Sequence, residues 1–103
     1  IAPLEALMSK YPEVKFILRS MYYDHVGIAA RHKNVYLDTA THMSGGMTVA
    51  AVQPVGTHRV LMGSNSPYGM LRREVEKIEA EPTFTGFQRS LIYSLNAERL
   101  LKL

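Results

Sequence analysis

The chain has 103 residues, of which 47% are apolar and 20% charged, with a net charge of +3. These values are typical of one globular domain and argue against a disordered chain. With no cysteine, the chain has no disulfide, thiolate nucleophile or cysteine-ligated metal.

No apolar run approaches the ~18 residues of a membrane span. Lys and Arg are dispersed, and Arg72 and Arg73 are followed at once by Glu74 and Glu76, as on a solvated helix face. We therefore expect neither a nucleic-acid partner nor a membrane, and a cytoplasmic location. The sequence opens at Ile1 without a methionine or a leader, which suggests a fragment or a processed chain.

The first predicted helix has Leu4, Leu7, Met8 and Tyr11 on one face and ends at Pro12. A strand is predicted over residues 14–18, with a loop over 19–23.

The second helix is predicted to begin with Asp24 as N-cap and to pack through Val26, Ala29 and Ala30. Asn34 is predicted to stop it in the left-handed conformation. The second strand follows over residues 35–39.

A small-residue loop containing His42 precedes a short helix over 47–52, and the third strand is predicted over 59–63. Ser66 and Pro67 are predicted to start the next helix. That helix would bury Leu71, Val75 and Ile78 and expose two ion pairs, Arg72 with Glu76 and Glu74 with Lys77.

The last segment begins with Thr85 and Gln88 at capping-box spacing, and Leu91, Ile92 and Leu95 are predicted to point inward. The three predicted strands alternate with helices, which indicates an α/β fold with a parallel sheet and right-handed crossovers.

Four segments, taken in order, resemble one family: residues 11–18, 30–39, 59–67 and 96–101. The chain is similar to the C-terminal portion of amidohydrolase-related metal-dependent hydrolases, a group that includes decarboxylases of the aminocarboxymuconate-semialdehyde type. The resemblance implies the last three strand–helix units of a (β/α)8 TIM-type barrel, with residues 1–103 as a single partial-barrel domain. It also implies that a partner chain, another part of the same chain or a second copy supplies the missing strands, because a sheet cut from a barrel has two raw edges.

The sequence departs from that family where the family's chemistry lies. The family's His-x-His motif has no counterpart, and a glycine–histidine pair is replaced by Arg19 and Ser20. The family's aspartate in Gly-Ser-Asp-Ser-Pro is Asn65, and a carboxamide cannot act as a base near neutral pH. We expect no cofactor on this chain alone; a divalent metal such as zinc belongs to a complete barrel.

Asn65 occupies the position of a catalytic residue, and the alternatives are that it caps its tight loop or faces a ligand without metal chemistry. Arg19, Ser20, Ser64 and His42 follow strand ends and are candidates for binding a small-molecule substrate.

Four further polar residues have structural interpretations. His25 is interpreted as a helix-end residue rather than a ligand, and His32 and His58 as structural. Asp38 is expected to cap the loop that follows its strand.

Two functions remain open. The first is a hydrolase or decarboxylase segment that needs the rest of the barrel for metal-dependent chemistry. The second is a non-catalytic scaffold or regulatory subunit with a degraded metal site, which Ser20 and Asn65 favour.

Overall fold

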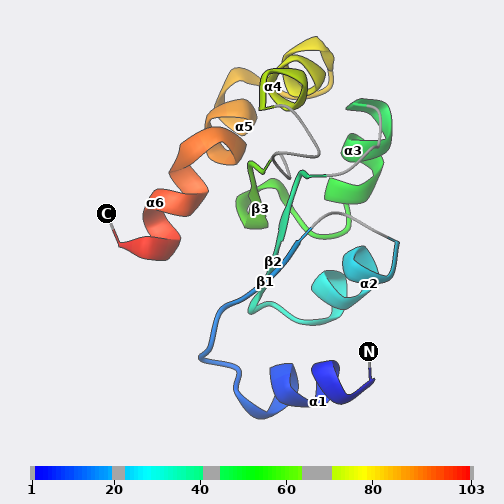
Figure 1. Ribbon diagram of the computed structural model, residues 1–103, viewed down its shortest axis with the longest axis vertical. Coiled ribbons are helices and arrows are strands. Elements are labelled where there is room, and N and C mark those ends of the chain that lie inside the picture. The colour runs from blue at the N-terminus through cyan, green and yellow to red at the C-terminus, as the bar shows by residue number, and fades with distance from the viewer. Residues whose placement is uncertain (1, 20–22, 41–44, 64–70, 103) are drawn as a thin grey trace.

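The computed structural model describes residues 2–19, 23–40, 45–63 and 71–102 (Figure 1). The elements in chain order are α1 (Ala2–Lys10), β1 (Phe16–Leu18), α2 (Tyr23–Arg31), β2 (Val35–Asp38), α3 (Gly45–Val52), the 3₁₀ turn η1 (Thr57–Arg59), β3 (Val60–Leu61), α4 (Leu71–Ala80), α5 (Gly86–Ser90), the π-helical turn η2 (Leu91–Leu95) and α6 (Asn96–Leu101).

The three strands form one parallel sheet in the order β1-β2-β3. Phe16 pairs with Val35 and Leu37 pairs with Val60, so each strand lies beside its neighbour in the sequence. The predicted βαβαβ arrangement is confirmed. The strands are shorter than predicted, because only residues that pair with a residue of the adjacent strand belong to the sheet.

The core lies between the sheet and the helices. Its fully buried members come from almost every element and include Met8, Ile28, Leu37, Val60, Ile78 and Ile92. In Figure 1, α1 lies beneath the amino ends of the strands and α4 lies near their carboxyl ends. The amino ends and the carboxyl ends of the strands therefore have different neighbouring helices.

Some predicted helix faces are wrong in detail. Of the face predicted for the first helix, Met8 is deeply buried, at 1% exposed, and Leu4 packs against the core, while Leu7 is 48% and Tyr11 41% exposed. On α2 the predicted Ala29 is fully buried and Val26 packs against the core, while Ala30 is exposed and Ile28 is buried in addition. The periodicity identified the helices correctly, but it cannot say which stripe has something to pack against.

The predicted helix ends also differ. Helix α2 begins at Tyr23, so Asp24 lies inside its first turn rather than at the N-cap. Asn34 is not left-handed, because Lys102 is the one non-glycine residue with positive φ in the described part of the chain. The Asn34 amide is buried and donates to the carbonyl oxygens of Met8, Tyr11 and Val14 at 2.9–3.2 Å. Asn34 thus ties the end of α1 to the start of β2.

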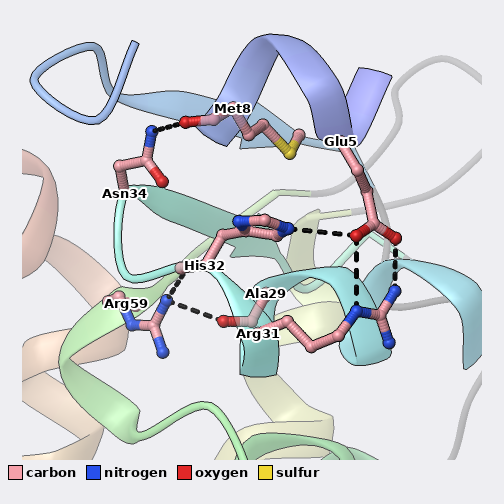
Figure 2. A network of polar contacts seen from close by, with 7 residues as sticks. All are labelled: Glu5, Met8, Ala29, Arg31, His32, Asn34 and Arg59. Atoms are coloured by element: carbon pink, nitrogen blue, oxygen red, sulfur yellow. Dashed lines mark hydrogen bonds and ion pairs between the residues drawn. The ribbon is translucent and has the colours of Figure 1, made fainter. Parts of the chain in front are cut away.

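Arg59 stabilises the same end of the sheet. Its guanidinium is buried and donates to four backbone carbonyls, those of Ala29, His32, Val35 and Val55, at 2.7–3.0 Å. Figure 2 shows Arg59 reaching the carboxyl end of α2, where helix carbonyls lack partners of their own. Burial lowers the pKa of Arg59, and the positive charge favours the negative end of the helix dipole.

The carboxyl-terminal helices begin as predicted. Thr85 and Gln88 form a complete capping box. Ile92 is buried, but Leu95 is 38% exposed, which corrects its predicted inward position. The start of α4 predicted at Ser66 and Pro67 lies outside the described residues.

Candidate functional site

The carboxyl ends of the three parallel strands lie along one edge of the sheet, at Leu18, Asp38 and Leu61. In open and closed α/β sheets this edge is where ligands bind. The candidate site is therefore built from the residues that follow these three ends.

Thr39 joins the ends of β2 and β3. It is fully buried, and its N–H donates to the Leu61 carbonyl at 2.9 Å. The Gly63 N–H donates to the Thr39 hydroxyl at 3.1 Å, and that hydroxyl lies 3.2 Å from the Gly63 carbonyl oxygen, to which it donates. Thr39 thereby fixes the point at which the chain enters segment 64–70.

The Asp38 carboxylate lies at the same edge. Its Oδ1 accepts from the Ala40 N–H at 3.0 Å, so the expectation that it caps the following loop is confirmed. It also lies against Gly63, because a Cβ built there would be 3.0 Å from the Asp38 Cγ. A side chain at position 63 would displace the carboxylate, which explains a glycine here without any unusual φ.

A buried ion pair from α4 lies beside Thr39. The Lys77 ammonium lies 2.6 Å from Glu74 Oε2, and the two side chains are only 12% and 11% exposed. Lys77 Nζ is also 3.4 Å from the Thr39 carbonyl oxygen. Glu74 Oε2 lacks a well-aligned hydrogen bond, so the short contact is one of charge.

The Glu74–Lys77 pair corrects one expectation from the sequence. It was expected to be solvated and weak, but it is buried because α4 turns this face toward β2. The i, i+3 spacing revealed the pair; the burial had no signal in the sequence.

The residues predicted for the site divide into two groups. Arg19 directly follows β1 and is exposed, so it lies at the carboxyl edge with Asp38 and Gly63. Ser20, His42, Ser64 and Asn65 lie outside the described residues, and their roles stay predictions.

The described residues do not provide a donor set for a metal centre. No three His, Asp or Glu side chains gather closely enough to hold a metal ion in the part of the chain that the structure describes. Among the residues outside it, Ser20 and Asn65 offer only neutral oxygens where a metal site usually has imidazole or carboxylate. No chemical step is therefore assigned to a metal here.

A second polar network lies at the opposite end of the sheet, near the amino ends of the strands (Figure 2). The Glu5 carboxylate accepts from the Arg31 guanidinium and lies 3.0 Å from His32 Nε2. The Arg31 hydrogen bond, with that of His32, holds the pKa of Glu5 at about 2. This network joins α1 to α2, and the structural interpretation of His32 agrees with it.

His58 lies in η1 at the amino end of β3, with its imidazole over Gly56. Burial and the nearby charges of Arg59 and Arg99 lower the pKa of His58. Gly56 has a φ of 96° and leaves no room for a Cβ beneath that ring. These features fit a structural turn.

A cleft of about 250 Å³ lies between α3, the turn before β3 and the start of α5. It does not touch Arg19, Asp38 or Gly63, so it is separate from the carboxyl edge. Among the described residues, no helix is long and apolar enough to cross a membrane.

Comparison with solved structures shows the fold. Over 94% of its length the chain superposes on the crystal structure of 2,6-dihydroxybenzoate decarboxylase complexed with 2,6-dihydroxybenzoate, with a TM-score of 0.77 and 18% sequence identity. A dihydroxybenzoic acid decarboxylase from Polaromonas sp. JS666, with bound manganese and the inhibitor 2-nitroresorcinol, matches over 94% with a TM-score of 0.75 and 20% identity.

This chain spans only 37% and 36% of the length of those two structures. The expectation of a partial (β/α)8-type barrel is thus confirmed at the level of the fold. No protein-family model matches the sequence, and no curated protein matches it.

Proposed function

We propose that this chain forms the last three strand–helix units of a (β/α)8-barrel decarboxylase or hydrolase that acts on a small carboxylated substrate. The observation that carries the proposal is the near-complete superposition on two dihydroxybenzoate decarboxylases. The alignment of three strand ends at one edge of the sheet supports it, since that edge is where barrel enzymes place their chemistry.

Among the candidate site residues, Arg19 has the strongest physical reason to bind the substrate, and we assign it that role. It follows β1 directly and carries a guanidinium, which binds carboxylates through paired hydrogen bonds. Ser20, His42 and Ser64 are assigned to polar contacts with the same ligand.

Asn65 is assigned the orienting of a reacting group, because its amide donates and accepts hydrogen bonds but exchanges no proton near pH 7. In the complete barrel we propose that residues outside this chain hold a divalent metal, zinc or the manganese named for the Polaromonas structure. We propose in the same way that residues outside this chain supply the strands that complete the barrel.

A non-catalytic scaffold is the second candidate. Ser20 and Asn65 favour it, because a complete metal site of this kind would use stronger ligands at both positions. In that case the barrel would be retained for assembly or regulation.

The test is decarboxylation of 2,6-dihydroxybenzoate by the purified protein in its native assembly, with manganese supplied and CO2 release measured. The enzyme proposal predicts turnover, and a loss of at least tenfold in kcat/KM for Arg19→Ala, since a charge-assisted hydrogen bond to the substrate carboxylate contributes about 1.5–3 kcal/mol. Lys33→Gln is the matched control, because Lys33 is exposed and lies at the amino end of β2. This variant should leave the rate unchanged.

Two results would separate the alternatives. A folded protein that binds no manganese, turns over no substrate and gains nothing from Asn65→Asp supports the scaffold. Turnover that is insensitive to both Arg19→Ala and Asn65→Ala would remove the site proposed on this chain.

A further inference from the structure

The two faces of the sheet have different neighbours at its carboxyl edge. Side chains alternate between the faces along a strand, and paired residues of parallel strands lie on the same face. Val35, Leu37 and Val60 are fully buried and belong to the core that the helices cover. Asp38 pairs with Leu61 and is only partly buried, so it lies on the opposite face. In a (β/α)8 barrel, where the helices lie outside, that face is the inner one.

The peptide group that joins Thr39 to Ala40 is held at both ends. Its N–H, from Ala40, donates to Asp38 Oδ1 at 3.0 Å. Its carbonyl, from Thr39, accepts from Lys77 Nζ at 3.4 Å. Because a peptide group is planar, a rotation of its carbonyl moves its N–H as well. The Lys77 contact on the helical side therefore restrains the hydrogen bond to Asp38 on the other side.

Gly63 belongs to the same group of contacts. Its N–H donates to the Thr39 hydroxyl at 3.1 Å, and its Cα lies so close to Asp38 that an added Cβ would be 3.0 Å from the carboxyl carbon. Gly63 is the last described residue before the candidates Ser64 and Asn65. A change in the orientation of Thr39 would thus reach both the Asp38 carboxylate and the start of that segment.

The Glu74–Lys77 pair is suited to orienting a neighbour more than to stabilising the fold. Its charged atoms are 2.6 Å apart, and the side chains are only 12% and 11% exposed. A buried ion pair contributes little net stability, because the loss of hydration offsets most of the attraction. The ammonium ends a flexible four-carbon chain, and the carboxylate restricts it to the position that faces the Thr39 carbonyl.

We propose that Lys77, held by Glu74, is a positioning residue of the candidate site, which sets the Thr39–Ala40 peptide and through it the Asp38 carboxylate. The inference rests on the proposed decarboxylase or hydrolase function. At this edge Arg19 supplies hydrogen-bond donors and Asp38 supplies acceptors, so their relative placement orients a bound substrate.

Two double variants separate this role from a general effect of charge on α4. Lys77→Met with Glu74→Gln, the uncharged-pair variant, removes both buried charges and nearly keeps the side-chain volumes. It should fold, because replacing both members of a buried pair is often neutral. Arg72→Met with Glu76→Gln, the exposed-pair control, removes the same two charges from exposed positions of the same helix.

Hydrogen exchange in the native assembly, followed by NMR, tests the contact directly. The Ala40 amide should exchange about tenfold faster or more in the uncharged-pair variant, because its peptide is released at one end. The Thr39 amide, which donates to the Leu61 carbonyl, should keep its wild-type rate, and the exposed-pair control should change neither. An unchanged Ala40 rate would overturn the proposal. Equal acceleration at both amides would also overturn it, since the pair would then stabilise β2 as a whole.

The assay with 2,6-dihydroxybenzoate gives the second measurement. The uncharged-pair variant should lose roughly fivefold or more in kcat, while KM stays within about twofold because Arg19 still binds the substrate carboxylate. An unchanged kcat in an active protein would refute the positioning role. Absence of turnover in the wild type would instead remove the proposed function, and the Ala40 exchange would still decide whether Lys77 orients the peptide.

Discussion

At the scale of single residues, the fold depends on side chains that hold backbone carbonyls at the amino edge of the sheet. Arg59 and Asn34 together contact seven such carbonyls. No carboxylate is among the Arg59 partners recorded in the described residues. Arg59 is thus a buried cation held by carbonyl dipoles.

Arg59→Met is expected to lower the free energy of unfolding by about 3 kcal/mol, because several buried carbonyls lose their donor while the side-chain volume is largely kept. Arg59→Lys should lose less, since an ammonium retains the charge and some of the bonds. Urea unfolding of the purified protein measures both. Equal stability of the Met variant and the wild type would contradict the stabilising role.

Gly63→Ala should destabilise the protein by about 1–2 kcal/mol, because its Cβ would meet the Asp38 carboxyl carbon at 3.0 Å. Gly86→Ala is the matched control, since a Cβ there has nothing within 4 Å. It should be neutral or stabilising by about 0.5 kcal/mol. Thermal unfolding measures the stability of the two variants side by side. Equal stabilities would contradict the predicted clash at position 63.

At the scale of elements, the helices are joined to the sheet by a few polar contacts. Helix α1 is held to α2 through Glu5, with Arg31 and His32. Helix α6 is held to β3 through Asn96, which is 1% exposed. Both contacts join residues more than 25 positions apart in sequence.

The Glu5 contact predicts a pH dependence. Its folded pKa is about 2, below the ordinary value of 4.5, so the stabilisation is present above pH 4.5 and is lost as the pH falls through 2. The difference in unfolding free energy between wild type and Glu5→Gln should be largest near pH 6 and close to zero at pH 2. Urea titrations across that range measure it, with Glu13→Gln, an exposed carboxylate, as control. A difference that is constant with pH would contradict the lowered pKa.

Asn96→Asp should cost about 3 kcal/mol, because a carboxylate would replace the amide that donates to the Thr57 and Val60 carbonyls. Ser94→Ala, exposed and two residues earlier, serves as control. Circular dichroism followed through urea unfolding reports the loss. A variant as stable as the control would mean that α6 is held by its apolar contacts alone.

At the scale of the whole molecule, the three-stranded sheet superposes on part of two larger decarboxylase structures. The 103-residue chain has a radius of gyration of 13.2 Å. A complete barrel of about 250 residues should have a value of about 18 Å. Small-angle scattering of the protein in its native assembly measures this, and a value near 13 Å at working concentration would show that the chain stands alone.

Much of the fold was predictable because it is local. Alternating apolar runs and helical periodicity located the strands and helices, and Thr85 and Gln88 gave the start of α5. Asn34 shows the limit of such reasoning. Its residue type indicated a left-handed helix stop, whereas its side chain instead bonds three carbonyls 20 to 26 residues away.

The residues at the strand ends were predictable in the same measure. Position directly after a strand was enough to select Arg19, and the capping role of Asp38 followed from its place at a strand end. Thr39 and the burial of the Glu74–Lys77 pair were missed, because they come from contacts between β2, β3 and α4.

The sequence by itself determined the order of strands and helices, the parallel arrangement and the presence of a carboxamide at Asn65, since these depend on residue type and near spacing. Only the tertiary structure decided that Asp38, Thr39 and Gly63 meet at one edge, that Arg59 is buried without a carboxylate in its described contacts, and that the Asn96 amide donates to the Val60 carbonyl. The physical reason is that these contacts join residues separated by 24 to 36 positions, whose proximity arises from packing of the whole chain and has no local pattern.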